Sequence, residues 1–145
     1  MSDSLLASYL LQAAGALITT AIFGGFYREY HKAFLREWAL SWAALCVTLA
    51  GAGIGVVLSW HLPLANPLRI GLSALVGATG YMQVVWLLFG SNELLGHRPY
   101  SGRERAFLLG AAAFIGAAIV AIHATDPDGQ AVRFMFRAGV RGVIV

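Results

Sequence analysis

Four histidines are the residues of this 145-residue chain best suited to metal or proton chemistry. His61 and His123 each lie at the end of an apolar stretch, and His123 is close to Asp126 and Asp128. Imidazole binds transition metals and changes its charge near physiological pH. His61 and His123 are therefore weak candidates for a metal or pH-sensing site, although their spacing does not resemble that of a known set of ligands.

The sequence contains no motif that would point to catalysis. We find no P-loop, no GxGxxG, no HExxH and no GxSxG. The single cysteine, Cys46, lies within an apolar run, so neither a disulfide nor a CxxC site can form within one chain. We therefore expect no enzymatic activity and no bound cofactor or metal.

The polar residues inside the apolar stretches are uncharged. If the stretches that contain them run parallel, Gln83 lies at a depth similar to Thr19 and Thr20. A hydrogen bond between them would hold two helices together, and in a membrane such a bond contributes about 0.6 kcal/mol. A ligand pocket at the same place is the alternative interpretation.

The composition excludes most soluble classes of protein. Hydrophobic residues make up 59% of the chain and charged residues 12%, whereas a soluble domain has about 25% charged residues. Disordered chains are poor in apolar residues, which excludes disorder as well. The Lys and Arg residues are confined to short segments rather than to one face of a domain, so we expect the lipid bilayer as a partner and no nucleic acid.

Four stretches contain no Asp, Glu, Lys or Arg: residues 4–27, 38–68, 70–92 and 106–125. About 20 helical residues cross the hydrocarbon core, so each stretch is long enough to span it once. Pro63 and Pro67 end the second span early. The sequence thus predicts an all-α, polytopic transmembrane helical bundle, a single membrane domain with spans at about 5–27, 38–60, 70–90 and 106–124. Ionisable residues mark ion pathways, so their absence from the span interiors disfavours ion-coupled transport.

The charges in the connections predict an orientation. Connections 28–37 and 93–105 each contain three Lys or Arg residues, whereas the connection between the second and third spans contains only Arg69. By the positive-inside rule, the two basic connections are cytoplasmic and the N-terminus is external. Three arginines in the tail on the outer side, Arg133, Arg137 and Arg141, reduce this difference.

Residues 131–145 follow a turn at Asp126-Pro-Asp-Gly129 and are too few to span a membrane. We expect them to form a partial helix, the start of a fifth span whose remainder is missing. A voltage-sensing or headgroup-binding helix is the alternative, because the tail arginines recur every four residues and trace one helical face.

Small residues recur at four-residue spacing, as in Gly51-xxx-Gly55, Ser73-xxx-Gly77 and Ala112-xxx-Gly116. Small side chains let helix backbones approach closely. This pattern favours packing within the bundle, and it also allows a homodimer through the small-residue faces.

The segment 27–42, Tyr-Arg-Glu-Tyr-His-Lys-Ala-Phe-Leu-Arg-Glu-Trp-Ala-Leu-Ser-Trp, is the most distinctive in the chain. It resembles the junction between the first two spans in the multi-helix membrane regions that precede bacterial sensor histidine kinases and diguanylate cyclases. A second partial match covers residues 87–99, where a span ends in Leu and Gly before a basic connection that contains proline.

This resemblance implies a membrane sensor or anchor in the inner membrane of a bacterium, in a signal-transduction protein such as one of a two-component system. The chain has no phosphoacceptor helix, ATP-binding domain or GGDEF motif, so its cytoplasmic output domain would lie beyond Val145. The stimulus is not encoded in any recognisable motif. The alternatives are a self-contained channel or transporter subunit and an assembly factor.

Overall fold

The computed structural model describes the backbone of residues 2–63 and 66–125, and the side chains of residues 4–63 and 66–121. The described chain forms four helices: α1 (Ser2–Tyr30), α2 (Ala33–His61), α3 (Pro67–Leu94) and α4 (Gly102–Thr125). Each contains a segment long and apolar enough to cross a membrane. The predicted all-α fold with four long apolar helices is confirmed, while the predicted partial helix 131–145 lies outside the described residues.

Each helix is longer than the span predicted for it. Helix α2 begins five residues before Trp38, and α3 continues to Leu94, past the predicted end at residue 90. The absence of charge marks the part of a helix suited to the hydrocarbon core, whereas the helical hydrogen bonds continue into the interfacial region. Apart from Lys32 and Arg98, the described charged residues that the sequence analysis placed in connections therefore lie within helices.

Local signals fix the helix ends. Asn66 caps α3, because its side chain accepts a hydrogen bond from the Leu68 N–H at 3.0 Å, and Pro67 occupies the first turn. His31, directly after α1, has a φ of 52°, and Gly96, shortly after α3, has a φ of 72°. These left-handed residues turn the chain out of its helices within a few positions.

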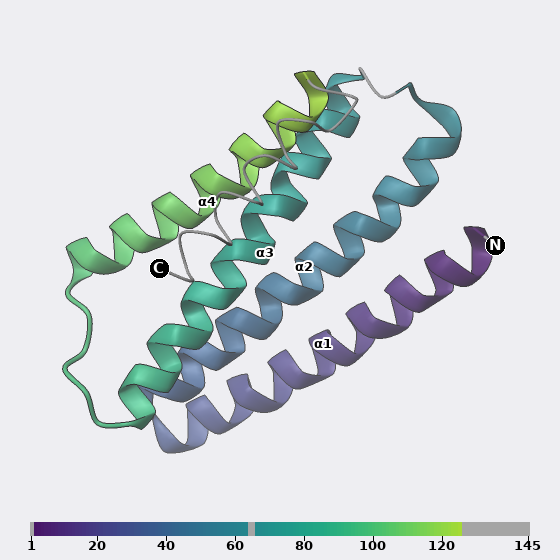
Figure 1. The fold of residues 1–145 in the computed structure, drawn as a ribbon. Coiled ribbons are helices and arrows are strands. Elements are labelled where there is room, and N and C mark those ends of the chain that lie inside the picture. Colours follow the sequence, from purple (N-terminus) through teal and green to yellow (C-terminus); the bar gives the residue numbers. More distant parts are fainter. Residues whose placement is uncertain (1, 64–65, 126–145) are drawn as a thin grey trace, which may run out of the picture.

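The helices form an open row in chain order (Figure 1). Helix α1 packs against α2, α2 against α3 and α3 against α4, and among the described residues α1 approaches neither α3 nor α4. The connections α1–α2 and α3–α4 lie at the same end of the row, and the connection α2–α3 lies at the other (Figure 1). At the level of the backbone, each helix of this bundle therefore packs only against the helices before and after it in the described chain.

Small residues bring neighbouring helices together. A Cβ at Gly77 would lie 2.7 Å from the carbonyl oxygen of Gly116, so α3 and α4 meet backbone to backbone. A Cβ at Gly51 would lie 2.6 Å from Cγ2 of Val76, so a side chain of α3 rests on the backbone of α2. These glycines pack helices of the same chain against each other, which is the role in bundle packing that the sequence favours.

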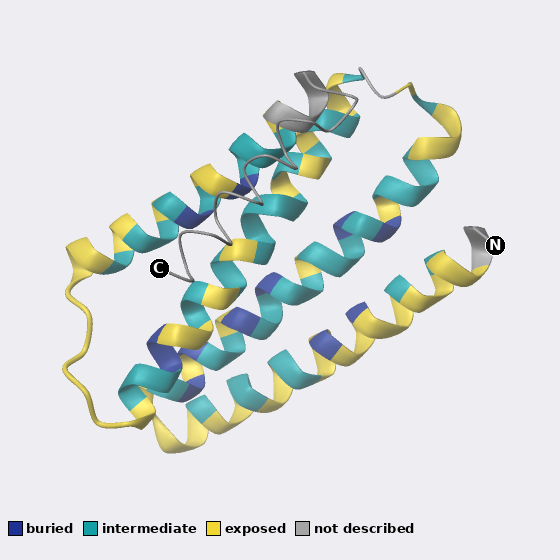
Figure 2. Cartoon of the chain, viewed as in Figure 1, coloured by how far each residue is buried: buried dark blue, intermediate teal, exposed yellow. Residues whose placement is uncertain are grey.

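Few residues of the four helices are buried (Figure 2), and many large hydrophobic side chains are exposed. The buried residues are few and mainly small, and large side chains such as Leu11, Phe107 and Phe114 are more than 70% exposed. A soluble monomer rarely exposes apolar area on this scale, whereas lipid chains solvate it without penalty. The four helices are therefore compatible with a multi-pass membrane protein.

Candidate functional site: a buried charge cluster at one end of the row

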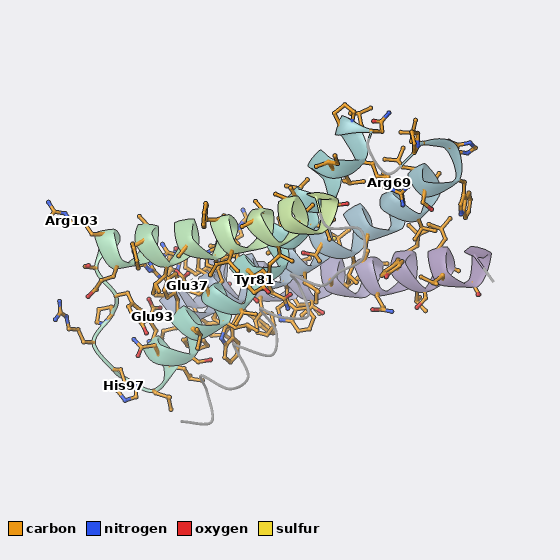
Figure 3. All side chains as sticks on the ribbon, turned by 45° about the horizontal axis from the view of Figure 1, so that its top comes forward. Glu37, Arg69, Tyr81, Glu93, His97 and Arg103 are labelled. Atoms are coloured by element: carbon orange, nitrogen blue, oxygen red, sulfur yellow. The ribbon has the colours of Figure 1, made fainter. Side chains whose placement is uncertain are left out.

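A carboxylate, Glu37, is buried in the second turn of α2, with its side chain only 3% exposed. Its Oε1 accepts a hydrogen bond from Nη2 of Arg36 at 2.7 Å and lies 2.6 Å from Nη2 of Arg105, a residue of α4. The same Nη2 of Arg105 lies 3.5 Å from Oε1 of Glu93, near the end of α3. We call these four residues the Glu37 cluster. Glu37 and Glu93 lie toward the end of the row where α3 passes to α4 (Figure 3).

Aromatic rings support the guanidinium of Arg105. Its Cζ lies 4.9 Å from the centre of the Phe89 ring, an arrangement that favours a cation. Phe89 is 1% exposed and contacts the ring of Tyr100, in the α3–α4 connection, at 5.1 Å. Arg105 is therefore held by two carboxylates and one ring, and the residues around it come from three helices and a connection.

Trp38 packs α2 onto both of its neighbours at this end. Its ring meets those of Phe23 and Phe34 edge-on at 5.5 Å, and it lies directly over Gly90 of α3. Only a residue without a side chain at position 90 leaves room for the indole. Trp38 Nε1 and Glu93 Oε2 are buried with no hydrogen-bond partner among the described residues.

The cluster links helices whose backbones do not adjoin. Among the described residues, α2 and α4 make no direct backbone approach, yet Glu37 and Arg105 meet between them. Removing one member of such a buried pair leaves an uncompensated charge and costs about 3–5 kcal/mol. The cluster therefore fixes the position of α4 relative to α2 and α3 at this end.

The sequence analysis placed Glu37, Glu93 and Arg105 at the edges of the connections. The structure corrects this placement, since all three lie within helices and their charges meet one another. One signal in the sequence pointed to this contact. Glu37 and Arg105 each immediately precede a charge-free stretch, and the predicted topology puts the starts of those two stretches at the same end.

The polar residues predicted to join the first and third spans lie on helices that α2 separates. The hydroxyls of Thr19 and Thr20 donate to carbonyls of their own helix, those of Gly15 and Ala16. Gln83 contributes its backbone carbonyl, which accepts a hydrogen bond from Ser41 of α2 at 3.0 Å. The structure thus does not bring Gln83 to either threonine.

The hydroxyls that do meet are those of Thr48 in α2 and Thr79 in α3, whose Oγ1 atoms are 2.8 Å apart. This contact links the middle of α2 to α3.

The candidate metal histidines lie at the other end of the row. His61 is exposed in the last turn of α2, and His123 is in the last turn of α4, with its side chain outside the described residues. Among the described residues, no three His, Cys, Asp or Glu side chains are grouped so that they could hold a metal.

A shallow cavity of about 350 Å³ opens beside the Glu37 cluster, between the α1–α2 turn and the α3–α4 connection. Its lining residues are Lys32, Ala33, Phe34, Glu93, His97 and Pro99. A neighbouring hollow shares His97 and Pro99 and includes Arg98 and Glu104. The cavity is therefore formed by the start of α2 and by the segment that runs from the end of α3 into the α3–α4 connection, and its ionisable lining groups are Lys32, Glu93 and His97.

Comparison with known protein families, with curated proteins and with solved structures gave no match to this chain.

Proposed function

We propose that this chain is the membrane sensor or anchor region of a bacterial signal-transduction protein, a histidine kinase or diguanylate cyclase. Its N-terminus is external, and the α1–α2 and α3–α4 connections face the cytoplasm. The chain lies in the inner membrane, and its helices receive or relay a stimulus to a cytoplasmic output domain encoded after residue 145.

The resemblance of segment 27–42 to the membrane regions of such proteins supports this role. That segment includes Trp38, which packs α2 onto α1 and α3, and Glu37, which contacts Arg105 of α4. The charge distribution supports the orientation, because six Lys and Arg residues lie at or near the end that contains both connections, whereas Arg69 lies at the other end.

The Glu37 cluster is the observation that carries the proposal. A relay needs helices whose positions depend on one another. Arg105 of α4 contacts carboxylates of α2 and α3, so a shift of any one of these helices at this end changes the contacts of the other two. The cluster lies at the end that we assign to the cytoplasm, where an output domain would receive the shift.

The direct test is to read the gene in frame beyond codon 145. We expect a cytoplasmic kinase or cyclase domain, and a stop codon at that point in verified sequence would overturn the proposal. Solute uptake by proteoliposomes that contain this chain alone would also overturn it and would favour the channel or transporter alternative.

Reporter fusions test the orientation separately. Alkaline phosphatase, which is active only outside the cytoplasm, should be active when fused after Asn66 and inactive when fused after Gly96. The reverse pattern would contradict the assignment of the basic connections to the cytoplasm.

A further inference from the structure

The charges at the Glu37 end divide into a paired set and an unpaired set. Arg36 and Arg105 contact Glu37, and Glu104 caps the start of α4 by accepting a hydrogen bond from the Ser101 N–H at 2.7 Å. Among the described residues, four cations at this end have no ion-pair partner: Arg28, Lys32, Arg98 and Arg103. Two acidic residues here, Glu29 and Glu104, likewise have no ion-pair partner in the part of the chain that the structure describes, so cations outnumber carboxylates in the unpaired set. The surface at this end is therefore cationic.

The cavity beside the Glu37 cluster collects part of this charge. Lys32 and His97 are exposed, come from different connections and line the same space. Lysine offers up to three N–H donors, and a histidine ring offers at least one in either charge state. Donors from two different connections that line one cavity suit a phosphate group, whose oxygens accept several hydrogen bonds.

Glu93 also lines the cavity, but it does not oppose an anion strongly. Its side chain is 16% exposed, its Oε1 lies 3.5 Å from Arg105, and its Oε2 is buried. Its charge is therefore turned inward and neutralised by a guanidinium. Lys32 and His97 are the ionisable groups left facing the opening.

The position of the cavity indicates a lipid as the source of the phosphate. It lies at the end of four apolar helices, where headgroups begin, and Phe34 and Pro99 supply apolar walls. Basic pockets between transmembrane helices bind the headgroups of anionic lipids.

We propose that this cavity binds the phosphate headgroup of an anionic phospholipid, held by Lys32 and His97. The site is independent of the signalling role proposed above, since it requires only that the helices span a bilayer.

Native mass spectrometry of the purified chain in detergent tests the site. We expect phosphatidylglycerol to bind more tightly than phosphatidylcholine, and the Lys32→Gln variant to bind phosphatidylglycerol about fivefold more weakly, the effect of one surface cation. Lys32→Arg should retain binding, and His97→Leu, which has no donor, should weaken it by about twofold to threefold, as expected for loss of one hydrogen bond.

Arg103→Gln is the matched control, since Arg103 lies at the same end but points away from the helices and does not line the cavity (Figure 3). We expect it to change the affinity by less than twofold. A loss equal to that of Lys32→Gln would overturn the proposal, because it would mean diffuse attraction to a charged surface. Equal binding of phosphatidylcholine, or equally tight binding of soluble glycerol phosphate, would overturn it as well.

Discussion

At the Glu37 end of the row, one buried carboxylate of α2 contacts guanidinium groups from its own helix and from α4, and Glu93 of α3 joins the same arginine. At the opposite end, where α2 passes to α3, Arg69 is the only Lys or Arg among the described residues, and it donates to the carbonyl oxygen of Leu62 at 3.1 Å. The first end joins three helices through side chains, and the second joins two helices through a short turn. Consecutive helices are thus aligned by packing, and the charged contact occurs where α4 meets α2, a helix that its backbone does not adjoin.

The largest effect should come from removing the central carboxylate. Glu37→Gln leaves Arg36 and Arg105 without their shared partner, and we expect the free energy of unfolding in detergent to fall by about 3–5 kcal/mol. Arg69→Gln, the matched loss of one charge at the opposite end, should cost no more than about 1 kcal/mol, since one hydrogen bond to a carbonyl is lost. If a denaturant titration gave the same fall in the free energy of unfolding for both variants, charge would contribute equally to stability at the two ends.

In the middle of the row, α4 is held on α3 by an uncharged contact between Gly77 and Gly116. In Gly116→Ala, the new Cβ would lie 2.5 Å from the carbonyl oxygen of Gly77, and a backbone has to move to relieve the clash. We expect the free energy of unfolding, measured by the same denaturant titration, to fall by about 1–3 kcal/mol, which is typical of overpacking.

Gly110→Ala is the control for that substitution. Gly110 lies on the same helix with nothing near its missing Cβ, so the change should be neutral or stabilising by less than about 1 kcal/mol. If both variants behaved alike, the backbone contact between α3 and α4 would contribute nothing, and the Glu37 cluster alone would hold α4.

The two ends of α3 allow a comparison within one helix. At the Glu37 end, Gly90→Ala would push Trp38 aside and disturb its contact with Phe23. We expect the free energy of unfolding to fall by about 1–2 kcal/mol. This is the lower end of the range for overpacking, because a side chain moves more easily than a backbone. Near the opposite end, Gly71 has open space at its Cβ, so Gly71→Ala should have little effect. Near-ultraviolet circular dichroism would report the displaced indole, and an unchanged spectrum in Gly90→Ala would contradict this account.

The smallest effect concerns the uncharged contacts between the ends. Thr48→Val keeps the shape of the side chain and removes the hydroxyl that meets Thr79, so we expect a loss of about 0.6 kcal/mol. Thr19→Val removes a hydroxyl that bonds only within α1 and should change stability less. A loss above 2 kcal/mol for Thr48→Val would show that the middle of the row depends on polar contacts as much as the Glu37 end does.

The sequence was sufficient to predict the four helices, because charge-free stretches of the required length have few other solutions in lipid. It was not sufficient to predict where charged residues near the helix ends lie. Each span was taken to end at the nearest charged residue, so Glu37 was assigned to a connection. In the structure, α2 begins four residues before Glu37, and Glu37 is buried.

The pairing of polar residues was hard to predict for a different reason. Parallel orientation puts Gln83 and Thr19 at a similar depth, but depth does not determine which helices are neighbours. The order of the row is determined by close fits such as Gly77 on Gly116, which depend on shape at single positions. In a chain with 17 glycines, such positions do not stand out in the sequence.

The open row has a consequence for how this protein assembles. Each helix packs against the helix just before it, so α2 can associate with α1 as soon as it enters the membrane, and α3 and α4 can follow in turn. Contacts between sequence neighbours carry a low entropic cost of loop closure and form rapidly. Among the contacts that the structure describes, the pair Glu37–Arg105 is the one that joins helices not consecutive in the chain, and it can form only after the fourth helix has arrived. Until then Glu37 has only Arg36 beside it, so a ribosome-bound intermediate with three helices would be the form of this protein most open to quality-control proteases.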